Sequence, residues 1–112
     1  MTTAALSGQI ALVTGASRGI GAGIATALAQ EGLSVAVAAR KLESLAETVR
    51  VIEESGGRAF PVELDVTSAD SIRAAVEAVT ATLGPIDLLV NNAGINIPRP
   101  TLEATEEQWD QV

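Results

Sequence analysis

The 112-residue sequence contains no cysteine, no histidine and no tyrosine, and aromatic residues make up only 2% of it. Without cysteine, the chain has neither a disulfide framework nor thiolate chemistry. We assign no metal ligands. Apolar residues still account for 47% of the chain, which is enough to build a core and argues against disorder. Because aromatics are so few, alanine, valine, leucine and isoleucine must fill that core.

The charge balance is acidic, with seven basic and fourteen acidic residues and a net charge of −7. This balance argues against a nucleic-acid or membrane-surface partner. Residues 1–9 lack the basic start and long apolar core of a signal peptide. No apolar run approaches the roughly 20 residues that a membrane-spanning helix needs. We therefore expect a cytoplasmic protein with no nucleic-acid and no membrane partner.

Apolar runs alternate along the chain with amphipathic segments of helical period. The expected strands are residues 9–15, 34–40, 59–66 and 86–94, and the expected helices begin near residues 20, 42, 67 and 105. For the third helix, Thr67 and Asp70 have the spacing of a capping box. The alternation predicts an α/β fold, a doubly wound parallel sheet with right-handed crossovers. Pro61 lacks an N–H and belongs on an edge strand, which predicts the strand order 3-2-1-4.

The stretch TGASRGIG, residues 14–21, joins the first strand to the first helix. Ligands of such sheets bind at the carboxyl ends of the strands, and a helix N-terminus offers unpaired N–H groups to a phosphate. The absence of Cβ atoms at Gly15, Gly19 and Gly21 would let a pyrophosphate approach and the helix pack tightly. This stretch predicts a dinucleotide site, and a glycine-rich turn without a ligand is the alternative.

The glycine spacing T-G-x-x-x-G-x-G resembles that of the short-chain dehydrogenase/reductase family. LDV at 64–66, NNAG at 91–94 and EEQWDQV at 106–112 resemble further segments of that family, in the same order. The resemblance covers residues 9–112 and implies a Rossmann-type domain of an NADP-dependent, 3-oxoacyl-reductase-like enzyme. It also implies a small alcohol or ketone substrate and a full-length protein that forms a dimer or tetramer.

The family pattern implies a role for each matching residue. The pyrophosphate would lie among Gly15, Ala16, Ser17, Arg18, Gly19, Ile20 and Gly21, with Ile20 near the nicotinamide-side ribose. Asp65 would accept from the adenine amino group and Val66 would pack at the ring, while Asn92, Ala93 and Gly94 would line the adenosine ribose. Asp65 could instead be a partner of the third helix N-terminus. For Asn91, a structural role in holding neighbouring backbone is expected.

The choice between NADP and NAD is expected at the end of the second strand. Sites for NAD usually place an acid there, whereas sites for NADP use a nearby arginine. This chain has Ala39 at that position, followed by Arg40 and Lys41, and Arg18 can reach the same region. Because an arginine fork suits phosphate oxygens, the sequence favours NADP over NAD. A surface cation paired with Glu43 is the alternative, more for Lys41 than for Arg40.

Catalysis in the family depends on a tyrosine with a lysine four residues later, and on a serine and an asparagine. The sequence has no tyrosine, its single lysine is Lys41, and none of its serines matches the catalytic one. We therefore assign no catalytic residue. We expect residues 1–112 to be the N-terminal part of one dinucleotide-binding domain, truncated within the fourth helix and inactive alone. The alternative is a non-catalytic nucleotide-binding module completed by another chain; a flavodoxin-like binder or phosphoacceptor domain matches less well.

Overall fold

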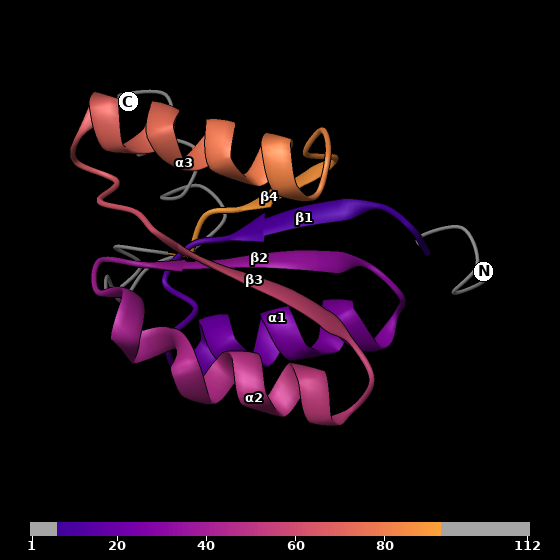
Figure 1. Ribbon diagram of the computed structural model, residues 1–112. Helices are drawn as coiled ribbons and strands as arrows, with labels where there is room; N and C mark the ends of the chain where they lie inside the picture. The colour runs from indigo at the N-terminus through magenta and orange to yellow at the C-terminus, as the bar shows by residue number, and fades with distance from the viewer. Residues whose placement is uncertain (1–6, 93–112) are drawn as a thin grey trace, which may run out of the picture.

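The computed structural model describes residues 7–92, which form a four-stranded parallel sheet with helices on both faces (Figure 1). The elements in chain order are β1 (Ile10–Val13), α1 (Gly19–Gln30), β2 (Ser34–Ala39), η2 (Leu42–Leu45), α2 (Ala46–Glu54), β3 (Arg58–Glu63), α3 (Ala69–Thr82) and β4 (Leu88–Val90). The strand order is β3-β2-β1-β4, and every pair is parallel. The predicted doubly wound, Rossmann-type α/β fold is confirmed.

Helices cover both faces of the sheet. Successive side chains of a strand point to opposite faces, so each strand contributes to both buried layers. Ala11 and Val13 of β1 belong to the core cluster beneath α1 and α2, whereas Ile10 and Leu12 belong to the cluster beneath α3. Figure 1 shows this layering, with α1 and α2 below the sheet and α3 above it. Continuous apolar strands are therefore required here, which is the pattern that predicted parallel pairing.

Pro61 lies in β3, at one edge of the sheet, as its missing N–H predicted. Within the described residues β3 pairs only with β2, where Pro61 stands opposite Val37. At the other edge lies β4, which pairs with β1.

Two helix starts differ from the sequence prediction. The capping box predicted at Thr67 is wrong: Ser68 is the N-cap of α3, and its hydroxyl accepts the backbone N–H of Ser71 at 3.2 Å. Thr67 does not cap the helix because its hydroxyl and N–H are both bonded to Asp65. The second helical segment begins with the 3₁₀ turn η2 before it continues as α2.

The predicted fourth helix, from residue 105, lies outside the described residues. Of the helices within residues 7–92, none combines the length and the apolar character needed to cross a bilayer.

Candidate dinucleotide-binding site

The three glycines between β1 and α1 have different structural roles. Gly15 and Gly19 have φ angles of 62° and 65°, a left-handed conformation that favours glycine. A Cβ at Gly19 would meet nothing within 4 Å, so the backbone there faces open space. A Cβ at Gly21 would lie only 2.0 Å from the carbonyl oxygen of Gly15. Gly19 thus leaves room for a ligand, whereas Gly21 allows α1 to pack against the preceding turn.

The end of β4 is tied to this turn by hydrogen bonds. The Thr14 hydroxyl accepts the backbone N–H of Asn92 at 2.8 Å and donates to Oδ1 of Asn91 at 3.1 Å. The side-chain amide of Asn92 donates to the carbonyl oxygen of Gly15 at 3.1 Å. Asn91 therefore has a structural partner, although that partner is a side chain and not the expected backbone. The ribose contact of Asn92 stays a prediction, and Ala93 and Gly94 lie outside the described residues.

The turn is also held from the side of β2 and α2. The N–H of Ala16 donates to the carbonyl oxygen of Ala38 at 3.0 Å. The Thr48 hydroxyl donates to the carbonyl oxygen of Ala16 at 2.8 Å and lies 3.3 Å from that of Ser17. Sequence reasoning missed Thr48. The available signal was a polar residue on the buried face of α2, between Leu45 at the end of η2 and Ile52.

Three cations follow the carboxyl ends of β1 and β2. Arg18 is the N-cap of α1, and Arg40 and Lys41 directly follow Ala39 at the end of β2; all three cations are exposed. Within residues 7–92, the ion pairs are Arg50 with Glu47, Arg50 with Glu54, and Arg73 with Asp70. None of these pairs uses Glu43, so the alternative pairing with Arg40 or Lys41 is not found there.

Asp65 follows β3, at the same carboxyl end of the parallel strands as the glycine turn. Its Oδ1 accepts from the Thr67 hydroxyl at 2.6 Å and from the Thr67 N–H at 3.0 Å. These hydrogen bonds, with a smaller contribution from the charge of Arg40, lower the pKa of Asp65 below its ordinary value. Ser68 caps α3, and Asp65 is also a partner of this helix start, because its N–H donates to the Ser71 hydroxyl at 2.9 Å. In the part of the chain that the structure describes, Oδ2 of Asp65 has no hydrogen-bond partner and can accept from a ligand.

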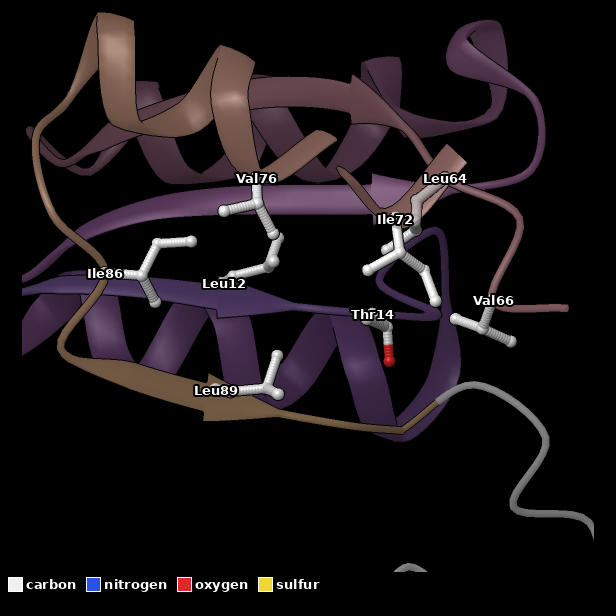
Figure 2. Close-up of a pocket in the computed structure, with 8 residues that line it drawn as sticks. All are labelled: Leu12, Thr14, Leu64, Val66, Ile72, Val76, Ile86 and Leu89. Atoms are coloured by element: carbon white, nitrogen blue, oxygen red, sulfur yellow. The ribbon is translucent and has the colours of Figure 1, made fainter. Parts of the chain in front are cut away.

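An apolar cavity of about 110 Å³ lies on the α3 face of the sheet (Figure 2). Its lining residues are Leu12, Thr14, Leu64, Val66, Ile72, Val76, Ile86 and Leu89. Thr14 and Val66 follow β1 and β3, so the cavity reaches the carboxyl edge of the sheet. Val66 is half-buried in this lining, and its predicted contact with an adenine ring stays a prediction.

The site has the chemistry of a phosphate and nucleotide receptor. It offers a helix N-terminus, a turn with open space at Gly19, exposed cations and one ionised carboxylate. No three histidine, cysteine or carboxylate side chains within residues 7–92 cluster in a way that could hold a metal ion.

Comparison with known proteins agrees with this arrangement. Residues 9–112 match the model of the family described as short chain dehydrogenase. The chain is 44% identical over 104 residues to the short-chain reductase protein NovJ of Streptomyces niveus, covering 93% of this chain and 40% of that protein. It is 43% identical over 103 residues to the 3-oxoacyl-[acyl-carrier-protein] reductase FabG of Staphylococcus aureus, covering 91% of this chain and 42% of that protein.

A solved structure of a short-chain type dehydrogenase/reductase from Mycobacterium marinum superimposes with a TM-score of 0.80 at 40% identity. The match covers 100% of this chain and 47% of that one. The chain thus spans less than half the length of each of these three proteins.

Proposed function

Because the chain belongs to the short-chain dehydrogenase family, whose members bind NAD or NADP, we propose that its glycine-turn site binds NADP(H) in preference to NAD(H). The observation that carries this proposal is the set of exposed cations at the ends of β1 and β2. Arg18, Arg40 and Lys41 form no ion pair within residues 7–92, although the charge of Arg40 acts on the carboxylate of Asp65. A 2′-phosphate carries nearly two negative charges and would form ion pairs with these cations.

The residues at the end of β2 also disfavour NAD. An NAD site uses an acid there to accept from the ribose 2′-OH, but this position holds Ala39. The lowered pKa of Asp65 keeps that carboxylate ionised, which suits an acceptor for the adenine amino group. The pyrophosphate would lie over Gly19 at the N-terminus of α1, with Ile20, 74% exposed, near the nicotinamide-side ribose.

We further propose that the site serves an oxidoreductase that acts on a small alcohol or ketone. The bound nicotinamide would supply or accept the hydride. This chain's own residues bind and orient the cofactor, and none of them is assigned to proton transfer. The sequence has no tyrosine and its single lysine is Lys41, so we expect the 112-residue chain to turn over no alcohol or ketone. We also propose that the full-length enzyme assembles as a homodimer or a homotetramer.

Arg40→Asp tests the cofactor assignment. This change removes a charge-assisted phosphate contact, worth about 1.5–3 kcal/mol, and introduces an acceptor for the ribose 2′-OH. NADPH binding should therefore weaken about ten- to a hundredfold, while NADH binding is retained or strengthened. Nicotinamide fluorescence titrations with both cofactors measure the two affinities.

Arg58→Asp is the matched control, because it makes the same charge change at an exposed site. Arg58 begins β3, at the opposite end of the strands from Arg40. It should alter NADPH affinity less than about threefold, the effect of a screened distant charge. Wild-type protein that binds NADH more tightly than NADPH would refute the proposal. Turnover of an alcohol or ketone by the chain would refute its expected inactivity.

A further inference from the structure

Thr48 is a polar residue held inside an apolar core. Its exposed fraction is 3%, and its neighbours on the same buried face, Leu45 of η2 and Ile52 of α2, are both fully buried. A valine at this position would occupy nearly the same space without burying a hydroxyl. The hydroxyl instead donates at 2.8 Å to the carbonyl oxygen of Ala16, 32 residues earlier in the chain. Its distinct contribution is therefore a hydrogen bond between two separate elements.

The bond joins the two segments that carry the exposed cations. Ala16 lies two positions before Arg18, and its N–H is already fixed by Ala38 of β2. On the other side, α2 follows Arg40 and Lys41 through the single turn η2. Thr48 thus connects the backbone that presents Arg18 to the helix that continues from Arg40.

We infer that Thr48 is a positioning residue that sets the preference for the 2′-phosphate by holding the two cation-bearing segments in register. This inference rests on the proposed binding of NADP(H). A phosphate held by side chains of two segments binds most tightly when those segments are preorganised. NAD(H) has no 2′-phosphate for Arg40 and Lys41 to bind, so its binding depends less on this register.

Thr48→Val and Thr48→Ser separate the hydroxyl from the side-chain volume. In Thr48→Val the Ala16 carbonyl loses its partner, and we expect NADPH affinity to fall about tenfold while NADH affinity falls less than about threefold. Thr48→Ser keeps the hydroxyl and should stay within about twofold of wild type for both cofactors. Thr26→Val is the matched control, because the Thr26 hydroxyl donates at 2.9 Å to the carbonyl of Ala22 within its own helix.

The measurement is a titration of the full 112-residue chain and each variant with NADPH and NADH, together with thermal melting by circular dichroism. Equal weakening of both cofactors in Thr48→Val would overturn the inference, because it would indicate a merely structural role. Wild-type affinity in a folded Thr48→Val would also overturn it.

If Thr48→Val does not fold, Thr48→Cys, which has only a weak donor, is measured by the same criteria. Failure of both variants to fold would assign Thr48 to fold stability alone and overturn the inference. A wild-type chain that prefers NADH would refute the proposed function itself, whereas normal NADPH preference in folded Thr48→Val refutes only the role of Thr48.

Discussion

Gly21→Ala should destabilise the protein, although alanine is the better helix former. An added Cβ would lie 2.0 Å from the carbonyl oxygen of Gly15 and 2.7 Å from Nδ2 of Asn92. Real Cβ contacts are essentially never shorter than 3.0 Å, so α1 and the turn must separate by at least about 1 Å. The nearest atom belongs to the backbone, which cannot rotate away. The strain therefore acts on the junction between β1, α1 and the end of β4.

Three contributions determine how much the free energy of unfolding falls in Gly21→Ala. Overpacking of this kind costs about 1–3 kcal/mol. Breaking the bond from Asn92 to Gly15 costs about 0.5–1.5 kcal/mol more, and the helix propensity of alanine returns at most about 1 kcal/mol. The net destabilisation is about 0.5–4.5 kcal/mol, which lowers the Tm by about 2 °C or more.

Gly23→Ala provides the matched control in the same helix. A Cβ at Gly23 meets nothing within 4 Å, so this variant gains helix propensity without strain and should be more stable than wild type by up to about 1 kcal/mol. Thermal melting and urea unfolding, followed by circular dichroism, measure both variants. A Gly21→Ala protein as stable as wild type, or a loss of equal size in Gly23→Ala, would refute the assignment of Gly21 to close packing.

Three further predictions concern the cap of α3, the carboxylate after β3 and the exposed residue at the start of α1. Ser68→Ala should cost about 1 kcal/mol in urea unfolding and Ser68→Thr much less, because the threonine hydroxyl can still accept the helical N–H; equal losses would contradict the cap. Thr67→Val should raise the pKa of Asp65 toward 3.8 in an NMR titration, because it removes the hydroxyl that lowers it. Because the pKa of Asp65 is lowered in the folded state, its ionised carboxylate stabilises the fold above pH 3.8. This stabilisation is lost as pH falls through the folded-state pKa. An unchanged pKa in Thr67→Val would contradict the assignment. Ile20→Ala should leave the Tm unchanged, because the side chain is 74% exposed, but should weaken NADPH binding; a lower Tm would show that Ile20 supports the fold instead.

The sequence predicted the sheet because its patterns depend on local rules. Apolar runs marked strands buried on both faces, and the missing N–H of Pro61 placed β3 at an edge. The capping residue of α3 was misassigned because Thr67 and Ser68 are both good N-cap types. Only the competing bonds from Thr67 to Asp65, visible in three dimensions, decide between them.

The sequence indicated candidate site residues and ligand roles for them, but not how each residue packs in the fold. The spacing of the glycines does not reveal that Gly19 faces open space while Gly21 abuts the Gly15 carbonyl, since both facts depend on the path of the chain. The bond from Thr48 to Ala16 spans 32 residues and leaves only a polar position on an apolar helix face. The absence of ion pairs at Arg18 and Arg40 likewise depends on where every carboxylate of residues 7–92 lies.

The two edge strands of the sheet differ in their capacity to accept another strand. β3 carries Pro61 in its interior and charged residues, Arg58 and Glu63, at its ends, features that natural proteins use to block edge-to-edge pairing. β4 is Leu88–Val90, which contains neither proline nor charge, and among the described residues it pairs only with β1. An additional strand would therefore pair more readily with β4 than with β3. At β3, Pro61 and the charged end residues oppose both strand pairing and aggregation.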